Sequence, residues 1–116
     1  MLTFTRLYTG DDQQSHFEDV EVPLTSLDLG AISEKFPVTG LYYRTLPANY
    51  KSGWHITTTR QFVIILSGGV EIEVGDGTRR VFSAGDVFLS DDKTGQGHTS
   101  FSVNNQPRVC LFVTLE

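Results

Sequence analysis

Apolar and polar residues alternate over short segments of this chain and do not follow a helical period. In "VEIEV", Val70, Ile72 and Val74 lie on one side of an extended segment, and Glu71 and Glu73 lie on the other. Successive side chains of a strand point to opposite faces, so this pattern predicts a strand with one buried face and one face in water. Further strands are predicted for the segments "LTFTRLY", "HFEDVEVPL", "TGLYYRTLP", "GWHITTT", "QFVIIL", "RRVFS", "DVFLS", "TSFSV" and "VCLFVTL".

Turn signals separate the predicted strands about every ten residues, a spacing that favours an all-β sandwich or barrel. Two connections contain paired or spaced glycines, "SGGV" after "QFVIIL" and "GDGT" after "VEIEV". Glycine adopts the positive φ that short hairpin turns require, so both predict hairpins between consecutive antiparallel strands. Residues 25–39 are the least strand-like part and are consistent with a single helical turn or with a loop.

The segment "QFVIIL" is apolar on both faces except at Gln61. Val63 and Ile65 share the face of Gln61, and Phe62 and Ile64 occupy the other. A strand that is apolar on both sides is typical of a wall covered by a second sheet or by a partner subunit. The pattern therefore singles out Gln61 as a polar group in an apolar wall.

Composition narrows the class of protein further. The chain has 116 residues, enough for one domain that buries roughly two-thirds of its unfolded surface. Its one cysteine, Cys110, lies in an apolar run, which predicts a buried thiol and excludes a disulfide within the chain. Net charge is −5 without a clustered basic face, which argues against nucleic acid as the main partner. No apolar stretch approaches membrane-spanning length, so we expect a soluble protein of the cytoplasm that does not engage a membrane.

Two short motifs resemble those of the cupins, small β-barrels in which the motifs surround a central cavity. The first motif runs His-x-His, then Glu, then Gly, and its spacing is met by His55, Thr57, Gln61 and Gly68. Thr57 replaces the second histidine and Gln61 replaces the glutamate. The second motif begins with a Gly-Asp pair, met by Gly85-Asp86, and ends in Gly-x-x-His, met by Gly95 and His98. It lacks the usual proline before Gly95, and its spacing is longer than usual.

The resemblance implies an all-β, RmlC-like jelly-roll (double-stranded) barrel. It implies a single domain over residues 1–116, with N-terminal strands in residues 1–39 and a motif core over about residues 40–115. It also implies a homodimer, because cupins often pair their barrels and the apolar wall needs a cover.

Cupins typically use these motif positions to hold a divalent transition metal. The corresponding residues here are His55, Gln61 and His98, which suit Fe, Mn, Ni, Zn or Cu. The absent carboxylate predicts weaker binding, unless Asp91 or Asp92 supplies one from the loop before His98. Gln61 has an alternative, purely structural interpretation, in which its amide forms hydrogen bonds with backbone groups of the barrel.

Other residues complete the candidate pocket. Tyr42 and Arg44 share one face of "LYYRT", and a guanidinium facing inward would bind a carboxylate or phosphate of a substrate. If that face points outward, Arg44 is a surface residue. Thr57 shares a face with His55 and contributes a hydroxyl. The candidate substrate-binding residues are thus Tyr42, Arg44, Thr57 and Gln61.

The sequence is compatible with three functions. The first is a metal-dependent enzyme, an oxygenase or isomerase, acting on a small polar metabolite. The second is a metal-free lyase, isomerase or epimerase in which His55 or His98 takes and returns a proton. The third is a non-catalytic module that binds a small molecule. All three require His55 and His98 to meet in one cavity.

Overall fold

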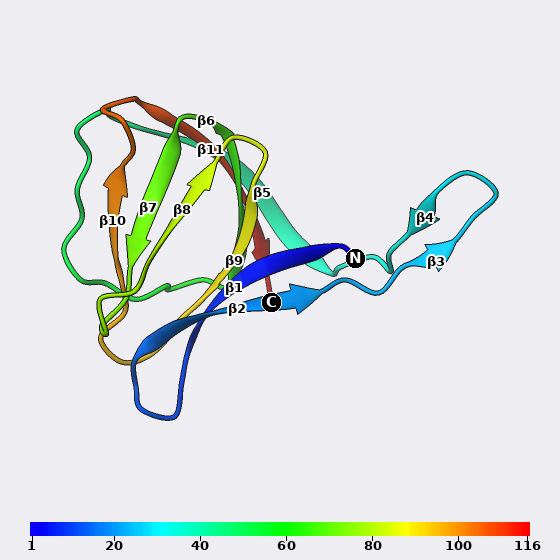
Figure 1. Ribbon diagram of the computed structural model, residues 1–116, viewed down its shortest axis with the longest axis horizontal. Helices are drawn as coiled ribbons and strands as arrows, with labels where there is room; N and C mark the ends of the chain where they lie inside the picture. The colour runs from blue at the N-terminus through cyan, green and yellow to red at the C-terminus, as the bar shows by residue number, and fades with distance from the viewer.

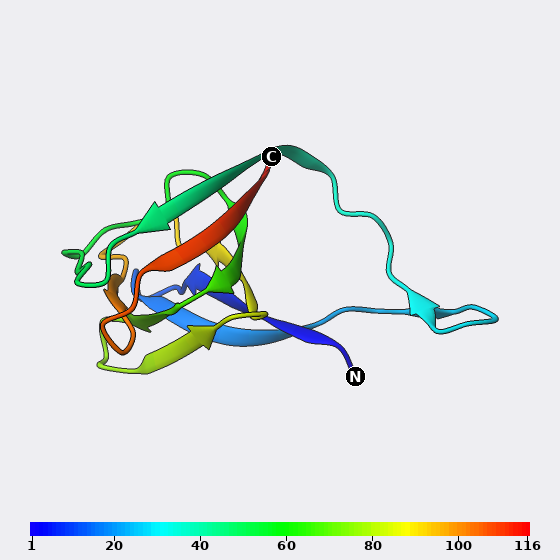
Figure 2. The same cartoon turned by 90° about the horizontal axis from the view of Figure 1, so that it is seen from above.

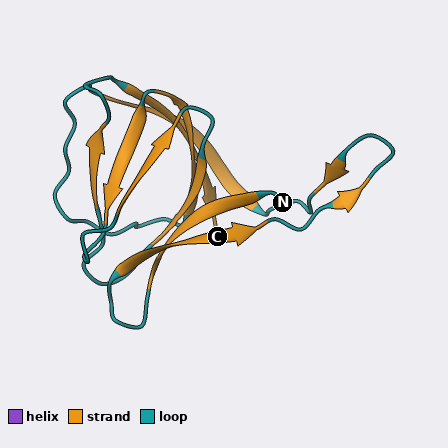
Figure 3. Ribbon diagram, in the orientation of Figure 1, coloured by secondary structure: helices purple, strands orange, loops and turns teal.

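A computed structural model describes all residues from 1 to 116, and its regular elements are strands without any helix (Figures 1 and 3). The strands in chain order are β1 (Thr3–Thr9), β2 (Ser15–Glu21), β3 (Thr25–Ser26), β4 (Ala31–Ile32), β5 (Val38–Leu46), β6 (Gln61–Ser67), β7 (Gly69–Glu73), β8 (Arg79–Ser83), β9 (Val87–Asp91), β10 (Thr99–Ser102) and β11 (Arg108–Leu115). The prediction of an all-β chain is confirmed. With no helix in the chain, none has the length and apolarity that crossing a membrane requires.

Two sheets form the body of the molecule. The larger has six strands in the order β2-β1-β9-β6-β11-β5, and the smaller has three in the order β10-β7-β8. All neighbouring strands are antiparallel except β1 and β9, which run parallel. The sheets face each other as a jelly roll, and no hydrogen-bonded ladder joins their edges into a closed barrel (Figure 1). The predicted jelly roll is thus present as two facing sheets.

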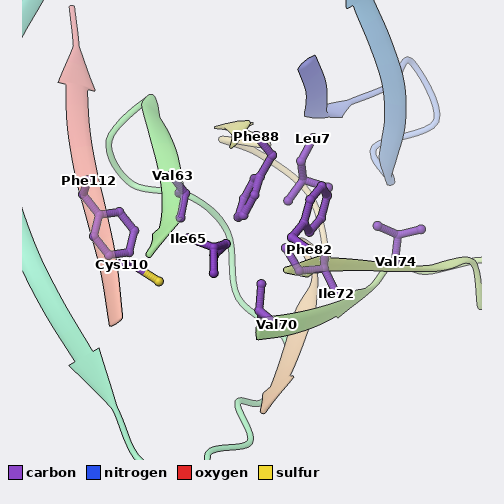
Figure 4. Packing of buried hydrophobic residues seen from close by; sticks show 10 residues of the cluster. All are labelled: Leu7, Val63, Ile65, Val70, Ile72, Val74, Phe82, Phe88, Cys110 and Phe112. Atoms are coloured by element: carbon purple, nitrogen blue, oxygen red, sulfur yellow. The ribbon is translucent and has the colours of Figure 1, made fainter. Parts of the chain in front are cut away.

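The core lies between the two sheets (Figure 4). Its members are inward-facing residues of β1, β6, β7, β8, β9 and β11, together with the residue after β7: Leu7, Val63, Ile65, Val70, Ile72, Val74, Phe82, Phe88, Cys110 and Phe112. The alternation that predicts the strand "VEIEV" also places its three apolar residues here, while Glu71 and Glu73 form ion pairs with Arg79 outside. Each fully buried apolar side chain contributes roughly 1.5–3 kcal/mol to folding, so this layer holds the sheets together.

The connection "SGGV" is a corner between sheets, so the predicted hairpin is wrong. Strand β6 belongs to the six-stranded sheet and β7 to the three-stranded sheet. Gly68 has a φ of 71°, and a Cβ there would collide with the carbonyl oxygen of Pro107. Glycine is therefore required for a close backbone approach that turns the chain from one sheet into the other. The connection "GDGT" does form the predicted hairpin between β7 and β8.

The segment "GWHITTT" is a loop, although its alternation predicted a strand. Its single strand-like contact is an isolated bridge between His55 and His98. The backbone N–H of His55 donates to the oxygen of His98 at 3.0 Å, and the reverse bond measures 2.9 Å. An alternating segment forms a strand only when a neighbouring strand pairs with it by a ladder of hydrogen bonds. Here the β-type pairing is limited to one residue pair.

Residues 25–39, for which a helical turn or a loop was expected, contain a small hairpin of β3 and β4. This hairpin extends away from the two sheets as an arm (Figures 1 and 2). At the arm's return to the body, Phe36 stacks on Phe62 with ring centroids 5.3 Å apart. The arm covers part of the outer surface of β6 and contributes no residue to the core between the sheets.

Candidate functional site

A cavity of about 190 Å³ opens between the two sheets next to the core. The walls near the core are apolar and include Val63 from β6 and Ile72 from β7. Polar side chains line the remainder: His55, Thr57, Thr58, Gln61, Ser90, His98, Ser100 and Arg108. An apolar pocket with a few converging polar groups is the usual form of a small-molecule site.

The two motif histidines meet in this cavity. Their ring centroids are 4.5 Å apart, although 43 positions separate residues 55 and 98 along the chain. The backbone bridge between them fixes this approach, because it holds the two segments side by side. His98 is 6 % exposed, whereas His55 is an exposed residue at the rim. The structure therefore gives the two imidazoles one buried and one solvent-facing position.

Asp92 orients the ring of His98. The Nδ1 atom of His98 lies 2.6 Å from Oδ2 of Asp92, whose side chain is completely buried. A carboxylate only accepts hydrogen bonds, so Nδ1 carries a proton, and in the neutral imidazole Nε2 is the nitrogen with the lone pair. This is the arrangement by which an aspartate fixes the tautomer of a catalytic histidine.

Two hydroxyl groups complete the surroundings of Asp92. Ser15 donates to Oδ2 at 2.7 Å, and Thr57 donates to Oδ1 at 2.7 Å. Thr57 also forms a hydrogen bond with the hydroxyl of Ser90. Buried charge is costly unless it is hydrogen-bonded, and these donors stabilise the carboxylate in the interior. Thr57, a sequence candidate for substrate binding, thus directs its hydroxyl proton to Asp92.

His55 has the same tautomer by a different contact. Its Nδ1 lies 2.9 Å from the carbonyl oxygen of Gly53, which accepts the Nδ1 proton. In the neutral form of each imidazole, Nε2 is therefore the nitrogen without a proton.

Gln61 lines the cavity, and its Oε1 accepts a hydrogen bond from the hydroxyl of Tyr42 at 3.3 Å. Tyr42 stacks on Phe112 with ring centroids 5.0 Å apart and lies outside the cavity lining. Arg44, on the edge strand β5, is exposed and is also absent from the lining. Of the four residues considered for substrate binding, Thr57 and Gln61 reach the cavity and Tyr42 supports Gln61 from behind.

Arg108 is a cavity residue that the sequence analysis missed. It is 6 % exposed, and its guanidinium carbon lies 5.8 Å from the ring centroid of Tyr50, another lining residue. Burial lowers the pKa of Arg108 below its usual range. The available signal was its spacing in "RVCLFV", where Arg108 shares the inward face with Cys110 and Phe112. Cys110 itself is buried as predicted, and burial raises the pKa of its thiol.

The residues present do not form a typical metal centre. No group of three His, Cys, Asp or Glu side chains is placed to hold a metal ion. The carboxylate of Asp92 is occupied by three donors, and Oε1 of Gln61 accepts from Tyr42. Two imidazole Nε2 atoms remain, which is fewer than the three or four protein ligands usual for a transition-metal site.

Comparison with known proteins identifies the fold. No protein-family model matches the chain, and no curated protein matches it either. A cupin 2 conserved barrel domain protein from Salinispora arenicola has a TM-score of 0.52 at 24 % identity, over 66 % of this chain and 61 % of its own. This chain therefore matches less than two-thirds of the length of that protein.

Two further solved structures are similar. The Cnp3 cupin domain of Schizosaccharomyces pombe has a TM-score of 0.55 at 15 % identity, over 98 % of this chain and 82 % of its own. A conserved protein of unknown function from Streptococcus pyogenes has a TM-score of 0.50 at 18 % identity, over 73 % of this chain and 69 % of its own. The facing sheets, the cavity and these similarities agree with the motifs in the sequence. This chain therefore has the cupin fold, the RmlC-like jelly roll.

Proposed function

We propose that the protein is an enzyme that binds a small polar metabolite in the cavity and moves a proton on it without a metal. The observation that carries this proposal is the 2.6 Å contact between Nδ1 of His98 and the buried Asp92. In its neutral form, His98 then has the Nε2 lone pair in a cavity that admits a small molecule. A histidine in this state is a general base near neutral pH.

The reaction that fits is proton abstraction from a carbon next to a carbonyl group. Nε2 of His98 takes the proton, and the C–H electrons form an enolate. The imidazolium that results is stabilised by Asp92, as in other Asp–His pairs. Return of the proton by His98 to a neighbouring carbon gives an isomer, and delivery of a different proton to the opposite face of the same carbon, from water or a second acid, gives an epimer. Departure of a β-substituent instead gives a lyase product.

Gln61 and His55 have roles in this scheme. The Oε1 of Gln61 accepts from Tyr42, so its amide N–H groups remain to donate to the carbonyl oxygen as negative charge develops there. His55 shares the cavity with His98, so its neutral form can receive a proton at Nε2 and its imidazolium form can return one at the solvent side. Thr57 acts through Asp92 and is a positioning residue.

Hydrogen–deuterium exchange tests this proposal without knowledge of the natural product. The protein is incubated in D₂O with a panel of small oxo and hydroxy metabolites, and loss of C–H signals is followed by NMR. We expect exchange on at least one compound, and we expect His98→Gln to slow it by roughly 10²–10⁴-fold. The matched control is His16→Gln, because His16 lies outside the cavity and pairs with Asp12 at 2.9 Å.

Two results would contradict the proposal. Exchange that disappears with a chelator, and returns with one added divalent metal, would favour the metal-dependent alternative. Binding of a panel compound without any exchange would favour the non-catalytic module.

We also propose that the protein is a homodimer. Support comes from the outer face of the larger sheet, where Tyr43 and Leu41 of the edge strand β5 are 69 % and 59 % exposed. In register they continue into two apolar rows on the same face: Tyr43–Leu111–Ile64 and Leu41–Val113–Phe62. Contiguous exposed apolar surface of this kind marks protein–protein contact.

A further inference from the structure

Arg108 is a buried cation without a counter-ion. It is 6 % exposed, it takes part in none of the ion pairs of the molecule, and its Nε atom has no hydrogen-bond partner. A guanidinium keeps its charge in proteins, so it does not escape burial by losing a proton. Buried charges are normally paired and hydrogen-bonded, and a buried unsatisfied donor calls for an explanation.

The position of Arg108 points toward a ligand. It begins β11, where it shares the inward face with Cys110 and Phe112, and it lines the same cavity as His98. The ring of Tyr50 lies 5.8 Å from its guanidinium carbon and lines the cavity too. Tyr50 is held by two hydrogen bonds to Ser102, one from its backbone N–H to the hydroxyl and one to its carbonyl from the Ser102 N–H. The guanidinium therefore lies beside an anchored aromatic ring.

The charges around Arg108 make an anion the complementary partner. Burial lowers the pKa of Arg108, and a second cation, Arg44, lowers it further. No carboxylate of the chain is paired with Arg108, while the chain as a whole carries a net charge of −5. A local positive centre inside an acidic protein attracts an anion into the cavity and leaves neutral molecules unaffected.

We infer that Arg108 is the anion subsite of the cavity and that it binds the carboxylate of a small organic acid. A guanidinium fork matches the two coplanar oxygens of a carboxylate, and one guanidinium balances the single negative charge of that group. The cavity volume of about 190 Å³ admits a compound of a few heavy atoms. The presence of the subsite stands on this geometry alone. That the bound acid presents its reactive C–H to His98 rests on the proposed function.

Binding of small acids to the intact protein tests the inference. Pyruvate and malonate serve as carboxylate probes, pyruvamide as the uncharged match of pyruvate, and inorganic phosphate as the competing anion. Affinities come from calorimetric titration, and thermal unfolding is measured with and without each probe. We expect the carboxylates to bind and raise the melting temperature, with pyruvamide and phosphate weaker.

Arg108→Met should bind the carboxylates about tenfold to a hundredfold more weakly, the loss expected for charged hydrogen bonds. Without a probe, Arg108→Met should be at least as stable as the parent, because an unpaired buried charge is replaced by an apolar chain of similar length. This keeps a folding defect distinguishable from a binding defect. Arg79→Met is the surface control, since Arg79 pairs with Glu71 and Glu73 outside the cavity.

Three outcomes would overturn the inference: equal binding by parent and Arg108→Met, equal binding of pyruvate and pyruvamide, or loss of binding in Arg44→Met with retention in Arg108→Met. Failure of the proposed function has a different signature. Carboxylate binding that depends on Arg108, without C–H exchange in D₂O, would keep the subsite and remove the proton-transfer chemistry.

Discussion

Asp92 differs from the other acidic residues of the chain because no part of it reaches solvent. Its oxygens accept from Ser15, Thr57 and His98, so its negative charge is balanced by donors that come from three separate segments. Such a carboxylate can orient an imidazole without itself taking the proton. At the scale of single residues, Asp92 therefore determines what His98 can do.

Substitution of Asp92 by Asn tests this role. The amide of Asn has the size of the carboxylate, but only its oxygen accepts hydrogen bonds. At least one of the groups that now donate to Asp92 would therefore face an N–H₂ group. We expect a loss of about 1–3 kcal/mol in the free energy of unfolding in urea. We also expect nitrogen NMR to show His98 losing its fixed Nδ1–H tautomer. Asp11→Asn, at an exposed turn, should change neither quantity. An unchanged tautomer in Asp92→Asn would contradict the role.

Residue chemistry was only partly predictable from the sequence. His55 and His98 are recognisable because they occupy motif positions, whereas Asp92 was considered only as a metal ligand. The partner of a buried carboxylate depends on which segments the fold brings to it, and Ser15 is 77 positions away. Arg108 was missed because arginine is normally exposed, and nothing local shows that the start of β11 lies inside the molecule.

At the scale of elements, the corner at Gly68 determines how the cavity forms. It sends the chain from β6 in one sheet to β7 in the other, and both strands contribute to the cavity wall. The backbone of Pro107 and Arg108 packs directly against this glycine. The corner therefore also positions the start of β11, and with it Arg108.

Substitution of Gly68 by Ala should be strongly destabilising. A Cβ there meets the Pro107 carbonyl, and φ is in the left-handed region, so we expect a loss of about 2–4 kcal/mol. Gly77→Ala is the matched control, because Gly77 also has a positive φ but has open space around its Cβ position. It should lose only about 1 kcal/mol. Equal losses in urea unfolding would show that packing against Pro107 contributes little.

Strand positions were predictable because one buried face imposes a period of two, as in "VEIEV" and "VCLFVTL". The pairing partners of the strands were less predictable from the sequence. "SGGV" has the residues of a hairpin turn, yet its flanking strands pair with β9 and β11 on one side and with β8 and β10 on the other. "GWHITTT" has the alternation of a strand but finds one bridge only. Local composition encodes the tendency to extend, and the tertiary fold selects the partner.

At the scale of the whole molecule, the two faces of the larger sheet have different surroundings. Its inner face packs on the core, and its outer face carries the apolar rows that end at Leu41 and Tyr43. Part of the outer face is covered by Phe36 at the base of the arm, and the edge at β5 is open. An open apolar edge strand is a natural place for a second copy to attach.

Light scattering after gel filtration tests the homodimer. We expect a mass of two chains for the parent at micromolar concentration and of one chain for Tyr43→Glu, since a charge at the edge opposes burial. Leu29→Glu is the control, because Leu29 is an even more exposed apolar residue on the arm, away from this face. A parent that elutes as a single chain would contradict the dimer, and dissociation by Leu29→Glu alone would assign the contact to the arm.

The hydrogen bonds of Asp92 have a consequence for the order in which the surroundings of this carboxylate form during folding. The contacts to Ser15 and Thr57 span 77 and 35 positions of the chain. Contacts of such long range form late, since closing them requires most of the intervening polypeptide to be in place. A nascent or partly unfolded chain therefore lacks the two hydroxyl donors to Asp92, and the fully hydrogen-bonded Asp92–His98 pair forms only with the completed tertiary structure.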